Sequence, residues 1–230
     1  SPARPRIVLR NGDVIYAYIM EGGEQGLKLN SEPLGELSIK CNSLRGIIFP
    51  TPNSAAEAAV EAFMSQKEAN EDQMFSPKGE TTAGFMNKFT DKELVLDVGG
   101  QKRTVPYEQM AAFRFAAVEK YTPQAGVLAA LRLSDGTVLS GQLAGLAGGK
   151  LSLKNADGAL WPVPEKALCS LEIRGGKLVF LTDLKPQAEE KPLVGGMPLV
   201  RRWRTHASVT GEPLKIGRKE FARGIGVRSY

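Results

Sequence analysis

Cysteine and histidine are scarce in this chain. Among 230 residues there are two cysteines, Cys41 and Cys169, and one histidine, His206, and no CxxC pair occurs. A zinc site of the usual type needs four Cys or His ligands, so this sequence excludes one. The two cysteines form one disulfide or remain as two separate buried thiols. We expect buried thiols, because free cysteine is among the most buried residue types.

Long apolar runs are also absent. No stretch approaches the roughly 20 residues that a transmembrane helix needs, so we expect no membrane span. No signal peptide is recognisable, and residues 1–5 (SPARP) are typical of the start of a mature protein or of an arbitrary boundary.

Catalytic motifs are missing as well. His206 has no serine nucleophile motif near it, no P-loop occurs, and residues 224–226 are a lone Gly-x-Gly. Asp13, Glu80 and Asp135 occupy related positions in turns, where turn chemistry accounts for acidic residues. We therefore expect no catalysis, no metal and no cofactor.

Charge of one sign is in excess only near the end of the chain. The net charge is +5 and the pI is about 9.2, and most of the positive excess lies between Arg201 and Arg228. The remainder is close to neutral, which disfavours nucleic-acid binding there, since a phosphate-tracking groove carries its own Lys and Arg. The 25 glycines and 14 prolines, with 7% aromatic residues, indicate short strands joined by many turns.

One pattern occurs three times along the chain. Asn11-Gly12 separates two β-rich runs, Asp135-Gly136 repeats this arrangement, and Lys78-Gly79 is a degraded version. An Asn-Gly or Asp-Gly pair predicts a two-residue hairpin turn, because both central residues of that turn need positive φ. The turn glycines lie 67 and 57 residues apart, and the longer first interval matches an inserted helix.

Further strands follow each turn in the same order. They are predicted at 27–29, 94–96 and 151–153, then at 37–39, 103–106 and 160–164, and finally at 44–49, 110–115 and 168–173. Four or five short strands in about 50 residues are typical of a small twisted sheet that closes into a barrel. Trp161 lies within one of these strands, and we expect it in the core.

The inserted helix is predicted over residues 54–70. Ala56, Ala59, Val60 and Phe63 form an apolar stripe at helical spacing. The stripe either packs on the adjacent barrel, which is the more common arrangement, or binds a protein partner.

The spacing of strands and glycines resembles that of Sm-like and SH3-like small β-barrels over residues 5–50, 71–116 and 126–181. The resemblance implies a mainly β fold: three tandem small barrel-like units with one inserted α-helix, then a partial β-sandwich (jelly-roll) segment. Sm proteins bind RNA through loop residues, and the repeats show no equivalent of them. Barrel edges and the helix at 54–70 are the candidate protein-binding surfaces.

Residues 181–230 resemble the opening of the NPCBM family of carbohydrate-binding modules. The resemblance rests mainly on residues 211–227 (GEPLKIGRKEFARGIGV), where an apolar strand precedes Gly-x-x-x-aromatic and Arg-Gly-Ile-Gly-Val. Arg228 stands where the family usually has histidine. The resemblance implies a partial β-sandwich and a glycan as partner.

The basic residues of this segment are the candidate ligand-binding residues. Trp203 can stack on a sugar ring or a base, or it is a strand-edge residue between solvated arginines. The candidates are Arg201, Arg202, Trp203, Arg204, Arg223 and Arg228. We expect a non-catalytic, extracytoplasmic (periplasmic, cell-surface or secreted) binding or scaffold protein associated with carbohydrate recognition. The alternative is single-stranded nucleic-acid binding by Sm-like barrels with an Arg-rich tail.

Overall fold

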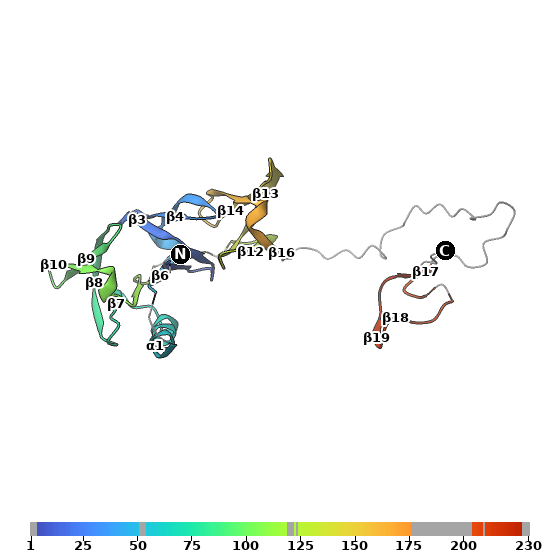
Figure 1. The fold of residues 1–230 in the computed structure, drawn as a ribbon, viewed down its shortest axis with the longest axis horizontal. Helices are drawn as coiled ribbons and strands as arrows, with labels where there is room; N and C mark the ends of the chain where they lie inside the picture. The colour runs from blue at the N-terminus through green and yellow to red at the C-terminus, as the bar shows by residue number, and fades with distance from the viewer. Residues whose placement is uncertain are drawn as a thin grey trace. The chain divides into compact units, whose positions relative to one another are not determined.

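The computed structural model describes residues 4–50, 54–118, 122, 124–175, 204–208 and 210–226. The chain divides into two compact units, residues 1–176 and residues 177–230. The first unit is mainly β with one α-helix, as the sequence predicts (Figure 1).

Sixteen strands among the described residues of the first unit form one antiparallel sheet. The sheet is large and nearly closed, and it forms a barrel. Its main path runs β15-β14-β13-β2-β1-β6-β11-β7-β8-β3-β4-β5, with β9, β10, β12 and β16 attached. The strands are β1 (Arg6–Leu9), β2 (Val14–Tyr16), β3 (Tyr18–Gly23), β4 (Gly26–Ser31), β5 (Gly35–Lys40), β6 (Leu44–Ile48), β7 (Asp72–Phe75), β8 (Thr81–Phe89), β9 (Glu93–Val98), β10 (Gln101–Pro106), β11 (Ala112–Arg114), β12 (Leu128–Leu133), β13 (Val138–Ala147), β14 (Lys150–Lys154), β15 (Leu160–Pro164) and β16 (Leu168–Arg174).

Strand pairing follows the same scheme three times. In copy 1 (β1–β6) the first strand pairs with the second and the last strand, and the same holds in copy 2 (β7–β11) and copy 3 (β12–β16). A single 3₁₀ turn precedes each last strand: η1 (Cys41–Ser43), η2 (Tyr107–Gln109) and η3 (Glu165–Ala167). The copies are nevertheless not clearly three separate small barrels, because β6 pairs with β11, β3 with β8 and β2 with β13 across their boundaries.

The hairpin turns differ from the prediction in one respect. The glycine of the first turn, Gly12, has a φ of 90°, but the residue before it does not have positive φ. The Gly12 amide donates to the Leu9 carbonyl (3.1 Å), and the Leu9 amide donates to the Asp13 carbonyl (2.9 Å). This is a three-residue loop with glycine at its left-handed position, and Gly79 and Gly136 repeat it. The two-residue turn predicted from the Asn-Gly pair was therefore wrong.

The inserted helix, α1 (Ser54–Ser65), ends five residues before the predicted boundary. Its side chains Val60, Phe63 and Met64 are buried in one cluster with Ile48 of β6 and with Ala111 and Ala112, next to and in β11. The packing interpretation of the apolar stripe is therefore confirmed for Val60 and Phe63, whereas Ala59 of the stripe is exposed. The predicted core position of Trp161 is also confirmed, since 3% of its surface is exposed.

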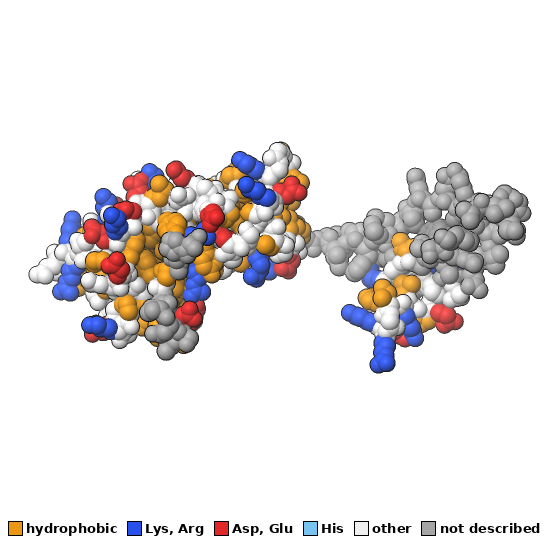
Figure 2. All heavy atoms as spheres, in the orientation of Figure 1, with side chains coloured by type: hydrophobic (Ala, Val, Ile, Leu, Met, Phe, Trp, Pro, Cys, Tyr) orange, Lys and Arg blue, Asp and Glu red, His pale blue; other side chains and the backbone are white. Residues whose placement is uncertain are grey.

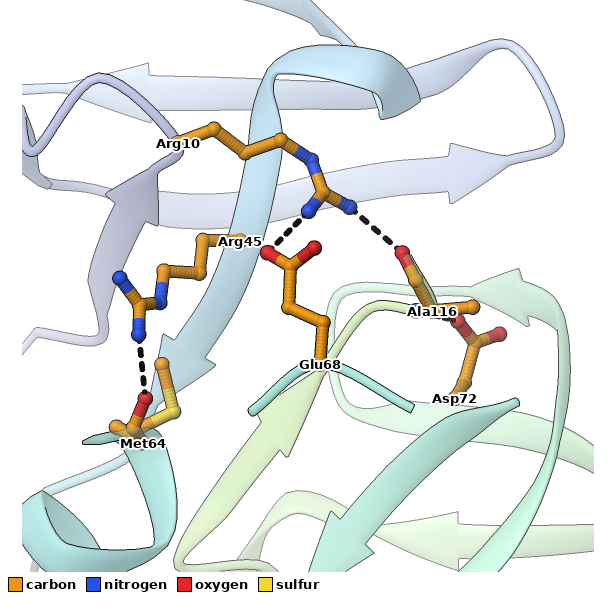
Figure 3. A network of polar contacts seen from close by, with 6 residues as sticks. All are labelled: Arg10, Arg45, Met64, Glu68, Asp72 and Ala116. Atoms are coloured by element: carbon orange, nitrogen blue, oxygen red, sulfur yellow. Dashed lines mark hydrogen bonds and ion pairs between the residues drawn. The ribbon is translucent and has the colours of Figure 1, made fainter. Parts of the chain in front are cut away.

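Polar contacts fasten the segment after α1 to two copies of the repeat (Figure 3). The nearly buried Arg10 guanidinium donates to the Glu68 carboxylate and to the Ala116 carbonyl (2.6 Å). Asp72 accepts hydrogen bonds from the amides of Ala116 (2.7 Å) and Met86 (2.7 Å). The segment between α1 and β7 is thus held to copies 1 and 2 by a network of polar contacts.

The cysteines are not both buried. Cys41 is half-buried and donates to the Gly23 carbonyl (3.3 Å), whereas Cys169 is exposed on β16. Both are free thiols. The prediction of two buried thiols was wrong for Cys169, which is exposed on a strand that, among the described residues, pairs only with β12.

The described residues of the second unit form two small two-stranded sheets. Strand β17 (Arg204–Thr205) pairs with β20 (Ile225–Gly226), and β18 (Leu214–Ile216) pairs with β19 (Lys219–Phe221). Among the described residues of this unit whose exposure is defined, none is buried. Isolated two-stranded sheets have little stability of their own in water.

Candidate functional site

A groove of about 870 Å³ lies along the β3–β4 hairpin of the first unit. Strands β3, β4 and β5 form most of it, Lys88 of β8 contributes, and the turn between β14 and β15 forms one wall. The wall residue Asp157 accepts a hydrogen bond from Ser43 (2.9 Å), which fixes the turn against copy 1. The lining residues are Glu21, Gly22, Gly23, Glu24, Gln25, Gly26, Leu27, Lys28, Ser38, Ile39, Lys40, Lys88, Asp157 and Ala159.

Glycines shape the tight end of this groove. A Cβ atom at Gly22 would lie 2.2 Å from Cδ2 of Leu27, and one at Gly26 would lie 2.0 Å from the carbonyl oxygen of Ile39. Gly26 also has a φ of 141°, which side chains disfavour. Glycine at position 26 therefore allows the hairpin to approach β5 this closely, and glycine at position 22 leaves room for the Leu27 side chain of β4.

The charges in the groove nearly cancel. Three lysines and three acidic residues line it, and Lys28 forms an ion pair with Glu21. The hydrogen bond from Lys28 lowers the pKa of the exposed Glu21 carboxyl. Figure 2 likewise shows cations and anions interspersed over the visible face of the first unit. Such a surface does not suit a phosphate backbone, which requires an excess of Lys and Arg.

The sequence analysis missed the role of Asp13. Its buried carboxylate accepts hydrogen bonds from the Ser140 amide (2.8 Å), the Ser140 hydroxyl (2.6 Å) and the Asn11 side chain (2.8 Å). Burial raises the pKa of this carboxyl, and these hydrogen bonds oppose the rise. Asp13 lies where β2 meets β13 through Val14 and Val138, so it joins copy 1 to copy 3.

Asp135, by contrast, behaves as predicted. It accepts a hydrogen bond from the amide of Thr137 (2.9 Å), two residues further along its own turn. Asp13 and Thr137 each directly follow a turn glycine, whereas Asp135 directly precedes one. Asp13 is therefore equivalent to Thr137 and not to Asp135. The sequence analysis placed Asp13 and Asp135 in related positions, and that alignment was wrong.

Two predicted ligand-binding residues lie among the described residues of the second unit. Arg204 lies in β17 opposite Gly226, and the His206 amide donates to the Gly224 carbonyl (2.8 Å). Arg223 lies in the bend just before Gly224 and β20, outside the paired strands, and both arginines are exposed. The other candidates, Arg201, Arg202, Trp203 and Arg228, lie outside the described residues.

An aromatic ring lies in the neighbouring pair of strands. Phe221 of β19 is partly exposed, and the Lys219 ammonium lies 5.4 Å from the centre of its ring. Lys215 forms an ion pair with Glu220 (2.8 Å) on the same two strands. Phe221 is the aromatic residue that follows Gly217 in the Gly-x-x-x-aromatic segment from which the resemblance was drawn.

Comparisons of this chain with protein-family models, with curated proteins and with solved structures found no match. Among the described residues, no group of three or more His, Cys, Asp or Glu is placed to hold a metal ion. None of the helices there is long and apolar enough to cross a membrane.

Proposed function

We propose that this chain is a non-catalytic, extracytoplasmic scaffold protein that associates with carbohydrate. In this proposal the sheet of the first unit is a rigid support made of three tandem small β-barrel units. The small sheets of the second unit contact the glycan.

The repeated strand pairing favours a role for the first unit as a rigid support. Three copies share one pairing scheme, one 3₁₀ turn and one bulge position, and they join edge to edge. The bulges fall at Ile19/Glu21, Met86/Lys88 and Leu143/Gly145, seven residues after each turn glycine. A continuous sheet with buried cores resists deformation, because interiors packed like crystals are nearly incompressible.

The pairing of β17 with β20 is the observation that carries the carbohydrate role. Arg204 lies in β17, and Arg223 lies in the bend that leads into β20. Both arginines are exposed, and the partly exposed Phe221 lies in β19 of the same unit. A guanidinium offers five hydrogen-bond donors for hydroxyl or carboxylate oxygens, and an aromatic face provides a stacking surface.

The test is a binding comparison on the full chain by calorimetry. Soluble neutral and acidic glycans are titrated alongside single-stranded RNA and DNA, at low and at high salt. We expect glycan binding that is weakened at least ten-fold in the double variant Arg204→Gln/Arg223→Gln. Arg103→Gln removes an exposed arginine from β10 of the first unit and should bind like the wild type.

Two results would overturn the proposal. The first is a failure to bind any glycan of the panel. The second is binding to single strands that falls steeply with salt, which indicates release of counterions from phosphates.

A further inference from the structure

Counting from the turn glycines shows which residues of the three copies are equivalent. Ile7, Met74 and Leu131 each lie five residues before a turn glycine. Each of them pairs with one residue of the last strand of its own copy. These partners are Ile47 in β6, Phe113 in β11 and Leu171 in β16, and they therefore occupy equivalent positions.

Copies 1 and 2 contact each other through equivalent residues. Ile47 lies opposite Phe113 where β6 pairs with β11, and the pairs on either side are Gly46 with Arg114 and Ile48 with Ala112. Antiparallel pairing that is centred on two equivalent residues is the signature of an approximate two-fold axis. In a dimer such a contact is called isologous.

A second contact obeys the same symmetry. Gly22 of β3 pairs with Phe89 of β8, and each lies ten residues after its turn glycine. Copies 1 and 2 are thus joined at two places by like residues. They form an internal pseudo-dimer.

Copy 3 has the same face without a partner. Among the described residues, β16 pairs with β12 alone. Leu171 is 42% exposed and Ile173 is 50% exposed. Their equivalents in or just after β6 and β11 are at most 5% exposed: Ile47, Phe49, Phe113 and Phe115. Leu146, the equivalent of Gly22 and Phe89, is 68% exposed. Both contacts of the pseudo-dimer therefore have bare, apolar counterparts in copy 3.

We propose that copy 3 binds copy 3 of a second chain in the arrangement of the β6–β11 pair. Leu171 then lies opposite the partner's Leu171, and the two-fold axis passes between them. The apolar surfaces of Leu146, Leu171 and Ile173 leave water, and the unpaired backbone groups of β16 gain hydrogen bonds. An uncovered apolar edge otherwise favours aggregation.

The opposite face of β16 fits this assembly. The equivalent faces of β6 and β11 are covered by α1, through Ile48 and Ala112 and through the buried Arg114, which donates to the Phe63 carbonyl (2.9 Å). On β16 that face carries Ser170, Glu172 and Arg174, and the last two form an ion pair (2.9 Å). It can remain in water when the edges pair, so a dimer needs no covering helix.

The first test measures the mass of the full chain in solution by sedimentation equilibrium. We expect a dimer at micromolar concentration for the wild type. Leu171→Asp should be monomeric with an unchanged circular dichroism spectrum, because a charge would be buried at the axis. Leu160→Asp makes the same change at an exposed leucine of β15 and should remain dimeric. A wild type that stays monomeric at every concentration would overturn the proposal.

A second test fixes the register and does not depend on how Leu171→Asp folds. On the two-fold axis, a cysteine at 171 faces its own copy, whereas position 173 faces position 169. Cys169→Ser/Leu171→Cys should form a covalent dimer under mild oxidation, and Cys169→Ser/Ile173→Cys should not, with Cys169→Ser alone as background. Equal cross-linking of both variants would contradict this register. Neither experiment depends on glycan binding.

Discussion

Ile47 of β6 lies directly opposite Phe113 of β11, and both side chains are fully buried. They are equivalent residues of two sequence repeats, and they meet on an approximate two-fold axis inside a single chain. The same position in the third repeat, Leu171, is partly bare. One sequence pattern has therefore produced two different environments.

The first prediction concerns this difference in burial. Phe113→Ala removes a fully buried ring and should lower the free energy of unfolding by about 3–5 kcal/mol. Ile173→Ala acts at a half-exposed position and should cost about 1 kcal/mol or less in the monomer. Urea unfolding of each variant below the dimerisation concentration measures both values. Equal losses would show that β11 and β16 are in similar environments.

The second prediction concerns the close approach of β6 to its neighbours. A Cβ atom at Gly46 would lie 2.5 Å from the carbonyl oxygen of Phe113 and 2.6 Å from Cε of Met64. Because the backbone oxygen cannot move freely, Gly46→Ala should destabilise the protein by about 1–3 kcal/mol. Gly145 has open space around it, and Gly145→Ala is the matched control. Thermal unfolding that is unchanged in Gly46→Ala would refute the β6–β11 geometry.

The third prediction concerns the pH dependence that Asp13 introduces. Burial raises the pKa of this carboxyl above its ordinary value of 3.8, so the folded state favours the protonated form. Its contribution to stability is then greatest below 3.8 and is lost as the pH rises through the folded pKa. Relative to Asp13→Asn, the wild type should therefore lose stability between acidic and neutral pH.

Asparagine is the informative replacement at this position. Its oxygen can accept from the Ser140 amide, and its NH₂ group can donate to the Ser140 hydroxyl. Asp13→Ala leaves the Ser140 amide without this acceptor and should cost about 1–3 kcal/mol, with the larger cost at acidic pH. Urea unfolding across the pH range measures both variants. A constant difference between wild type and Asp13→Asn would show that the carboxyl has an ordinary pKa.

The fourth prediction compares two ion pairs of different burial. Glu68→Ala leaves the nearly buried Arg10 guanidinium without its carboxylate and should cost about 3 kcal/mol. Glu61→Ala breaks an exposed pair with Arg6 and should cost less than about 1 kcal/mol. Denaturant unfolding of both variants gives the comparison. Equal effects would mean that Arg10 is solvated.

Local patterns in the sequence predicted much of the fold. Turn glycines and alternating strands gave the element order, and the stripe of Val60 and Phe63 gave the buried face of α1. These features depend on residues that are close in the sequence, where hairpin and helix periods are directly visible.

Contacts between copies could not be predicted in the same way. The sequence of a strand does not name its partner: β6 and β11 pair with each other, whereas β16 pairs, among the described residues, with β12 alone. The role of Asp13 depends on Ser140, which is 127 residues away. For the candidate ligand-binding residues, no periodic pattern links Arg204 to Gly226, its partner in the β17–β20 pairing.

Hydrogen exchange of the full chain tests most directly whether copies pair through like edges. Peptides that cover β6 and β11 should be protected equally at low and at high protein concentration, because their partner strands lie in the same chain. A peptide that covers β16 should exchange quickly at low concentration and become protected at high concentration. Exchange of β16 that does not change with concentration, whether fast or slow, would contradict the account.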